Sequence, residues 1–251
     1  RSNAVLNLTG SNFSIGGDAG TAAGTGNGTL NIVYGGVVMV AGSITETNGP
    51  GNTSGTSTIN LINGALSVGG LVRVDTLSAD NAVLSLTAGP TINAANPVCD
   101  VSNLTLATSV TLNVTGSVSL AQYPLIRYQG SIGGGGYGVV ALGTLPPDVS
   151  GYLTNNTANG SIDLVVTSVP AVRWAGTVSG DWDINLSTTW ISTRNGAATT
   201  YQETIIPGDV VIFDDTATGT KTVNLTTILS PATVIVNNTA AYVFTGTGQI
   251  S

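Results

Sequence analysis

Histidine is absent from this chain of 251 residues, and charged residues make up only 8% of it. Without an imidazole there can be no Ser-His-Asp triad, no histidine-based metal site and no imidazole acid or base. The single cysteine, Cys99, cannot form an internal disulfide, and no histidine is present to activate it. We therefore expect Cys99 to be a small buried apolar residue, and we predict that the chain is not an enzyme.

Basic residues are also scarce, with six Lys and Arg against 13 Asp and Glu and a net charge of -7. Nucleic acids and anionic membrane surfaces are bound by clustered Lys and Arg, so neither is an expected partner. No apolar run approaches the roughly 20 residues of a membrane-spanning helix, so no membrane insertion is expected.

Residues that favour helices are nearly missing, because the chain has two glutamates, Glu46 and Glu203, and one lysine, Lys221. Thr and Val, which favour strands, take their place, together with 34 Gly and many Asn that favour turns. Hydrophobic residues make up 41% of the chain and the mean hydropathy is +0.33, which indicates a packed core rather than disorder. The composition predicts an all-β fold.

A short phrase of apolar, polar and apolar residues, followed by a turn and a second short strand, occurs five times in the first 115 residues. The phrases end at positions 8, 32, 61, 86 and 106, at intervals of 24, 29, 25 and 20 residues. A drifting period in the twenties is typical of stacked β coils, so we predict a parallel β-helix of about five coils over residues 1–118. The five phrases are Leu6-Asn7-Leu8, Leu30-Asn31-Ile32, Ile59-Asn60-Leu61, Leu84-Ser85-Leu86 and Leu104-Thr105-Leu106. The second strands are expected at 13–15, 37–40, 65–68, 91–93 and 111–114.

The repeat ends near residue 119, and residues 119–169 are predicted to form a β-hairpin cap that covers the last coil. This segment contains four consecutive glycines at 133–136. No GKS or GKT and no helical pattern follows them, so we interpret them as a flexible turn and not as a phosphate loop.

All three tryptophans, Trp174, Trp182 and Trp190, lie in the third predicted segment, residues 170–251, at intervals of eight residues. This spacing fits three successive strands or turns that each contribute one ring to a shared cluster. Such a cluster is more often part of a core, but exposed rings could instead stack against sugars. Both roles remain open at this point.

The third segment resembles a module of very long bacterial proteins with autotransporter-associated β-strand repeats. The resemblance rests on W-A-G-T-V-S-G-D-W-D from Trp174 onwards, on P-G-D-V-V-I-F-D-D from Pro207 onwards, and on Y-V-F-T-G-T-G-Q-I-S at 242–251. It implies a secreted or surface-displayed, right-handed β-helix with a structural or adhesive role, and it implies no catalytic residues. The order differs from the usual module, because this chain begins with coils and ends with the opening elements.

The best candidate for enzyme chemistry is the pair Arg73 and Asp75, which are two residues apart on the expected strand 71–75 and so share a face. A basic residue beside acidic calcium ligands is the arrangement of β-helical polysaccharide lyases. The alternative, which we favour, is a surface ion pair. The nearest further acids, Asp80 and Asp100, have no regular spacing.

Calcium has weak candidate ligands in Asp209, Asp214 and Asp215, and in Asp181 with Asp183. Neither group matches an EF-hand or a nonapeptide calcium repeat, and no cofactor is predicted.

The sequence therefore predicts an extracellular or cell-surface structural module, acting as a stalk, an adhesin or a self-assembling filament. Strand edges at Leu6, Asn7, Leu8 and Ile250 are expected to join copies, or adjacent repeats, head to tail. The alternative is a carbohydrate-binding module that takes a surface polysaccharide through Trp174, Trp182 or Trp190, and a polysaccharide lyase is less favoured.

Overall fold

The fold is taken from a computed structural model, which describes all residues except 1–3, 11, 17–25, 47–54 and 204–206. Strands make up 56% of it, and the only helical turn in the described part is a 3-10 turn, η1 (Gly136–Val139). The predicted all-β class is confirmed. None of the described segments is a helix long and apolar enough to cross a membrane.

The chain forms two compact units, and each is described by itself. Unit 1 comprises Arg1–Gly116, Gln122–Pro146 and Gly151–Val165. Unit 2 comprises Ser117–Ala121, Pro147–Ser150 and Val166–Ser251.

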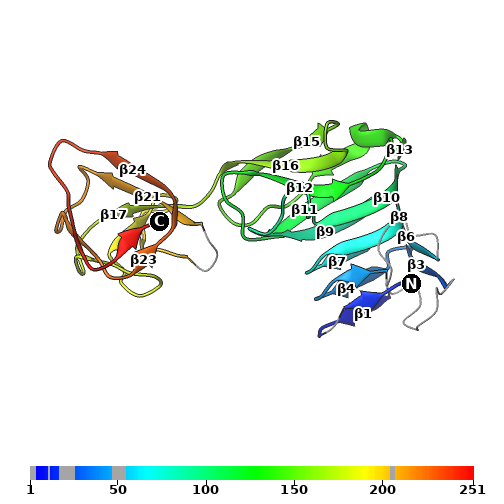
Figure 1. Cartoon of the computed structure of the whole chain (residues 1–251), viewed down its shortest axis with the longest axis horizontal. Coiled ribbons are helices and arrows are strands. Elements are labelled where there is room, and N and C mark those ends of the chain that lie inside the picture. The colour runs from blue at the N-terminus through cyan, green and yellow to red at the C-terminus, as the bar shows by residue number, and fades with distance from the viewer. Residues whose placement is uncertain (1–3, 11, 17–25, 47–54, 204–206) are drawn as a thin grey trace. The chain divides into compact units, whose positions relative to one another are not determined.

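The first sheet of unit 1 is parallel throughout, and its strands lie one above another (Figure 1). In order across the sheet they are β1 (Val5–Leu8), β4 (Val37–Val40), β7 (Ala65–Val68), β9 (Ala82–Ala88), β11 (Val110–Gly116) and β14 (Val140–Leu142). One column of aligned residues consists of Leu6, Val38, Leu66, Leu84 and Leu112. These residues face the core because side chains alternate between the two faces of a strand.

The second sheet of unit 1 contains the same kind of parallel stack. Its strands are β2 (Phe13–Ser14), β3 (Asn27–Val33), β5 (Ile44–Thr45), β6 (Thr56–Ile62), β8 (Val72–Asp80), β10 (Cys99–Leu106), β12 (Gln122–Arg127) and β13 (Gly133–Gly134). The long strand β8 pairs with β5 through its first residues and with β6 through its later ones. In the same way β10 pairs with β8 along its length, and with β12 and β13 on its other side.

The five phrases do not all stack on one another. Those at 6–8 and 84–86 lie in the first sheet, and the other three lie in the second. There they align with Leu77-Ser78-Ala79, a rung that the phrase search missed. Aligned residues of the first sheet fall at 6, 38, 66, 84 and 112, which are 32, 28, 18 and 28 residues apart. The five phrases are not equivalent strands, because both sheets share the same alternation and the phrase does not identify the sheet.

Two local predictions were also wrong. Residues 91–93 form turns and one isolated bridge, Asn93 with Asn96, instead of a strand. The glycine run is partly a strand, because Gly133 and Gly134 pair with Thr105 and Leu106 of β10. A side chain at Gly134 would approach the Leu106 carbonyl oxygen, and its φ of +72° also favours glycine.

The parallel stacking of the second sheet ends at β12. The next strand, β16 (Ser161–Ser168), runs antiparallel to β12, and β15 (Ser150–Asn156) lies beyond it at the edge of the sheet. The outer edge of β12 is therefore paired.

Unit 2 also contains stacked parallel strands. β17 (Ala171–Trp174), β21 (Gly208–Asp214) and β24 (Pro231–Asn237) form one stack, and β18 (Asp181–Trp182), β22 (Thr222–Leu225) and β25 (Val243–Gly246) form another. β23 (Ile228–Leu229) pairs with β26 (Gln249–Ile250). β19 (Trp190–Ser192) lies antiparallel to β17 and carries β20 (Ala198–Thr199) on its other edge.

Strands of seven, four and two residues follow one another in both units. This order occurs in β3, β4 and β5 of unit 1, in β21, β22 and β23 of unit 2, and again in β24, β25 and β26. The same order of strand lengths therefore occurs once in unit 1 and twice in unit 2.

Candidate functional site

The outermost strand of the first sheet, β1, leaves a core-facing leucine open to solvent. Leu6 is 43% exposed, although the residues aligned with it on the next two strands, Val38 and Leu66, are 7% and 1% exposed. An inner strand has neighbours on both sides, whereas among the described strands β1 has only β4. Asn7 is exposed and Leu8 is half-buried. An unpaired edge with an apolar core-facing residue is a template for another strand.

The last strands of unit 2 leave a similar edge. Phe244 on β25 is 39% exposed, while Val223, its partner on β22, is fully buried. Ile250 on β26 is 43% exposed, while its partner Leu229 is fully buried. The ring of Phe244 points to the core, because it lies 5.1 Å from that of the buried Phe213.

The two edges match in strand length. β1 and β25 each have four residues, and β2 and β26 each have two. Of the two exposed residues on β25 and β26, the sequence prediction named Ile250 but missed Phe244. Aligning V-F-T-G at 243–246 with the earlier T-V-N-L at 222–225 would have placed Phe244 next to a core position.

The tryptophans lie on β17, β18 and β19, and all three are fully buried. The Trp174 and Trp190 rings lie 5.0 Å apart and the Trp182 and Trp190 rings 5.3 Å apart, in edge-to-face arrangements. This confirms the predicted shared cluster. A sugar-stacking platform needs an exposed ring face, and these rings present none.

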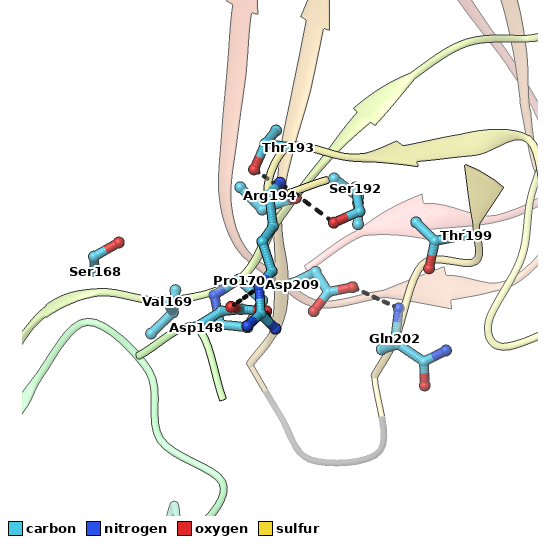
Figure 2. A pocket seen from close by; sticks show the side chains of 12 residues that line it. Asp148, Ser168, Val169, Pro170, Ser192, Thr193, Arg194, Thr199, Gln202 and Asp209 are labelled. Atoms are coloured by element: carbon cyan, nitrogen blue, oxygen red, sulfur yellow. Dashed lines mark hydrogen bonds and ion pairs between the residues drawn. The ribbon is translucent and has the colours of Figure 1, made fainter. Parts of the chain in front are cut away.

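Unit 2 contains a cavity of about 460 Å³ that holds Asp209 and Arg194 (Figure 2). The Arg194 side chain turns to Asp148, with Nε 2.8 Å from a carboxylate oxygen. Asp209 Oδ2 accepts a hydrogen bond from the Gln202 backbone N–H at 2.9 Å. Burial raises the pKa of Asp209 to about 6, against the lowering effect of that N–H. The cavity therefore contains a carboxyl group whose pKa lies well above that of an ordinary aspartate.

The other calcium candidates do not join Asp209. Asp214 pairs with Arg173 at 2.9 Å, at the opposite end of β21. Asp215 accepts hydrogen bonds from the backbone N–H groups of Thr239 and Ala240, which lower its pKa to about 2. No group of three acidic, cysteine or histidine side chains that could bind a metal occurs in the described part of the chain.

Asp181 accepts a hydrogen bond from Asn224 Nδ2 at 2.7 Å, and Asp183 accepts two from Ser187. The second acidic pair therefore has local structural partners.

Arg73 and Asp75 lie on β8, but their polar groups are engaged with different residues. The Arg73 guanidinium donates to the backbone oxygens of Val72, Val98 and Pro97 and to the Asn96 side chain. Asp75 is buried and accepts a hydrogen bond from the Ser57 backbone N–H. Cys99 is also buried, and burial raises its thiol pKa to about 12, as expected for an unreactive cysteine.

No protein-family model, curated protein or solved structure matches this chain.

Proposed function

We propose that this chain is a structural β-solenoid module that joins further copies, or adjacent repeats, head to tail through its coil edges. The observation that carries this proposal is the match between the β1 and β2 edge and the β25 and β26 edge. Both edges offer strands of four and two residues, with apolar core-facing side chains left open.

Parallel strands stacked in register support the solenoid architecture, because each coil contacts only its neighbours along the stack. The recurring order of seven, four and two residues supports coils of one kind in both units. In this architecture β15 and β16 act as a hairpin cap, and the resemblance to autotransporter-associated repeats supplies the right-handed sense.

The join pairs β1 of one copy with β25 of the next, and β2 with β26. β3 belongs to the same rung as β4, because β3 pairs with β6 as β4 pairs with β7. It therefore lies one rung further from the junction than β1 and β2. Across the junction, β24 of one copy and β3 of the next then lie two strand spacings apart, each of about 4.8 Å.

An extracellular or cell-surface location is part of the proposal. The scarcity of charge, the solenoid pattern and the family resemblance support it, with a role as a stalk, an adhesin or a filament. The carbohydrate-binding alternative has no comparable support, because the three tryptophan rings that would carry it are buried.

The experiment uses two charge substitutions, Leu6→Lys and Ile250→Lys, each of which blocks one edge. Sedimentation velocity of the parent is expected to show oligomers that grow with concentration, and each variant alone is expected to stay monomeric. An equimolar mixture is expected to form dimers and nothing larger, since each variant retains one working edge.

Leu186→Lys is the control, because Leu186 is 78% exposed and lies outside the strands of either edge. It should assemble like the parent. A parent that stays monomeric at millimolar concentration, or a mixture that forms no dimer, would contradict the proposal.

A further inference from the structure

Two carboxyl side chains lie together in the interior of unit 1. Glu46 is 4% exposed and Asp75 is 8% exposed, and Ser57 between them is fully buried. Glu46 directly follows β5, Ser57 lies on β6 and Asp75 lies on β8. They meet because β8 pairs with β5 and β6 at adjoining positions along its length. Sequence reasoning assigned no role to Glu46 or Ser57.

Ser57 links the two carboxyl groups. Its hydroxyl donates to Glu46 Oε2 at 2.6 Å, and its backbone N–H donates to Asp75 Oδ2 at 3.0 Å. The Asp75 backbone N–H in turn donates to the Ser57 hydroxyl oxygen at 2.8 Å. The serine has one hydroxyl proton, and Glu46 takes it.

Both carboxyl groups are bound to Ser57, so they lie close together. Two buried carboxylates repel each other, and a proton on one of them removes that repulsion. Glu46 Oε1 is buried and has no hydrogen-bond partner among the described residues. Since Oε2 already accepts from Ser57, Oε1 is the oxygen that can carry the proton.

The charged groups around the pair do not offset a second negative charge on Glu46. β6 carries no titratable residue, and Arg73 on β8 is directed to oxygens of Val98, Asn96 and Pro97. On β10, Asp100 pairs with Arg127. Burial, more than the charge of Asp75, raises the pKa of Glu46, and the Ser57 hydrogen bond opposes that shift only in part.

We propose that Glu46 carries a proton beside Asp75 and that the two residues, bridged by Ser57, act as a pH-sensitive latch that holds β5 and β6 against β8. Below the folded-state pKa of Glu46 this side chain is uncharged and the latch is closed. Above it Glu46 carries a buried negative charge beside Asp75, which favours separation of the strands. This inference does not rest on head-to-tail joining.

A metal ion is the competing occupant of a carboxylate pair. Calcium takes six to eight oxygen ligands, usually including water, and this pair is almost fully enclosed. The enclosure favours the proton.

The test compares the parent with Glu46→Gln, whose side chain is uncharged at every pH and whose oxygen can still accept from Ser57. The melting temperatures of the two proteins are expected to agree near pH 4. By pH 8 the parent should melt several degrees lower, because Glu46 must then either carry a charge in the interior or move out to solvent. Asp80→Asn, at the far end of β8, is the matched control and should follow the pH profile of the parent.

The carboxyl carbon of Glu46, followed by NMR in the parent, provides a readout that needs no variant. It is expected to titrate clearly above the ordinary pKa of 4.5. Titration at or below that value, or a melting difference that does not change between pH 4 and pH 8, would overturn the proposal. Stabilisation of the parent, but not of Glu46→Gln, by calcium at pH 8 would overturn it in favour of a cation site.

Discussion

At the scale of single residues, the contribution of a leucine depends on its place in the stack. Leu84 and Leu6 belong to the same aligned column, but Leu84 is buried between two strands and Leu6 lies at the edge. Leu84→Ala is expected to cost about 2–5 kcal/mol in the free energy of unfolding, and Leu6→Ala about 1 kcal/mol or less. Urea titration of both variants checks this, and equal losses would contradict an open edge at β1.

Asp209 gives a second prediction at this scale. Its pKa is raised from 3.8 to about 6, so the stability it contributes is fully present below pH 3.8 and is lost as the pH rises through 6. Asp209→Asn should therefore stabilise the protein by about 1 kcal/mol at pH 8, after allowance for solvent screening. At pH 3.5 the two proteins should be equally stable by denaturant titration, and a gain at that pH as large as at pH 8 would show a different cause.

Whether a cluster of residues could be predicted from the sequence depended on which strand pairings bring its members together. The tryptophan cluster was predictable, because three equally spaced rings in successive short segments have few ways to pack other than together. The Glu46 and Asp75 pair was not, because it depends on β5 and β6 both pairing with β8. No spacing along the chain reveals such a meeting of three strands.

At the scale of elements, a proline substitution should destabilise an inner strand far more than an edge strand. Ser78 lies within β8, with β6 on one side and β10 on the other, whereas Asn7 lies on β1, which pairs only with β4 among the described strands. Proline lacks a backbone N–H and breaks a ladder on an inner strand. Ser78→Pro is expected to cost about 3 kcal/mol or more, and Asn7→Pro clearly less, by thermal melting.

A similar loss in both proline variants would mean that β1 is as enclosed as β8. The comparison therefore tests the strand order independently of any assembly.

The strands themselves were largely predictable, but their partners were not. Alternating apolar residues and glycine-marked turns identify strands such as 37–40 and 65–68 because these signals are local. The sheet to which a strand belongs depends on the turns between strands, and the spacing of aligned residues in the first sheet varies from 32 to 18 residues. The asparagines of the phrases show this: Asn31 and Asn60 lie on neighbouring strands and share a side-chain hydrogen bond of 2.8 Å, whereas Asn7 lies in the other sheet beside Met39.

At the scale of the whole molecule, the net charge of -7 opposes the proposed joining, because every copy repels every other. Raising the salt concentration from about 20 mM to about 500 mM shortens the screening length from roughly 20 Å to a few ångströms. Association of the parent should therefore strengthen with salt, as seen by sedimentation velocity. Weaker association at high salt would indicate ion pairs across the junction in place of apolar strand edges.

The parallel direction of the stacked strands has a consequence for how such a fibre grows. The edge formed by β1 and β2 cannot pair with a second copy of itself in the same sense, so the two tips of any fibre are chemically different. A fibre fixed to a support by one tip always displays the other, and new units add there in a single orientation. A protein with one blocked edge, such as Leu6→Lys, would then stop growth at one tip and leave the opposite tip active.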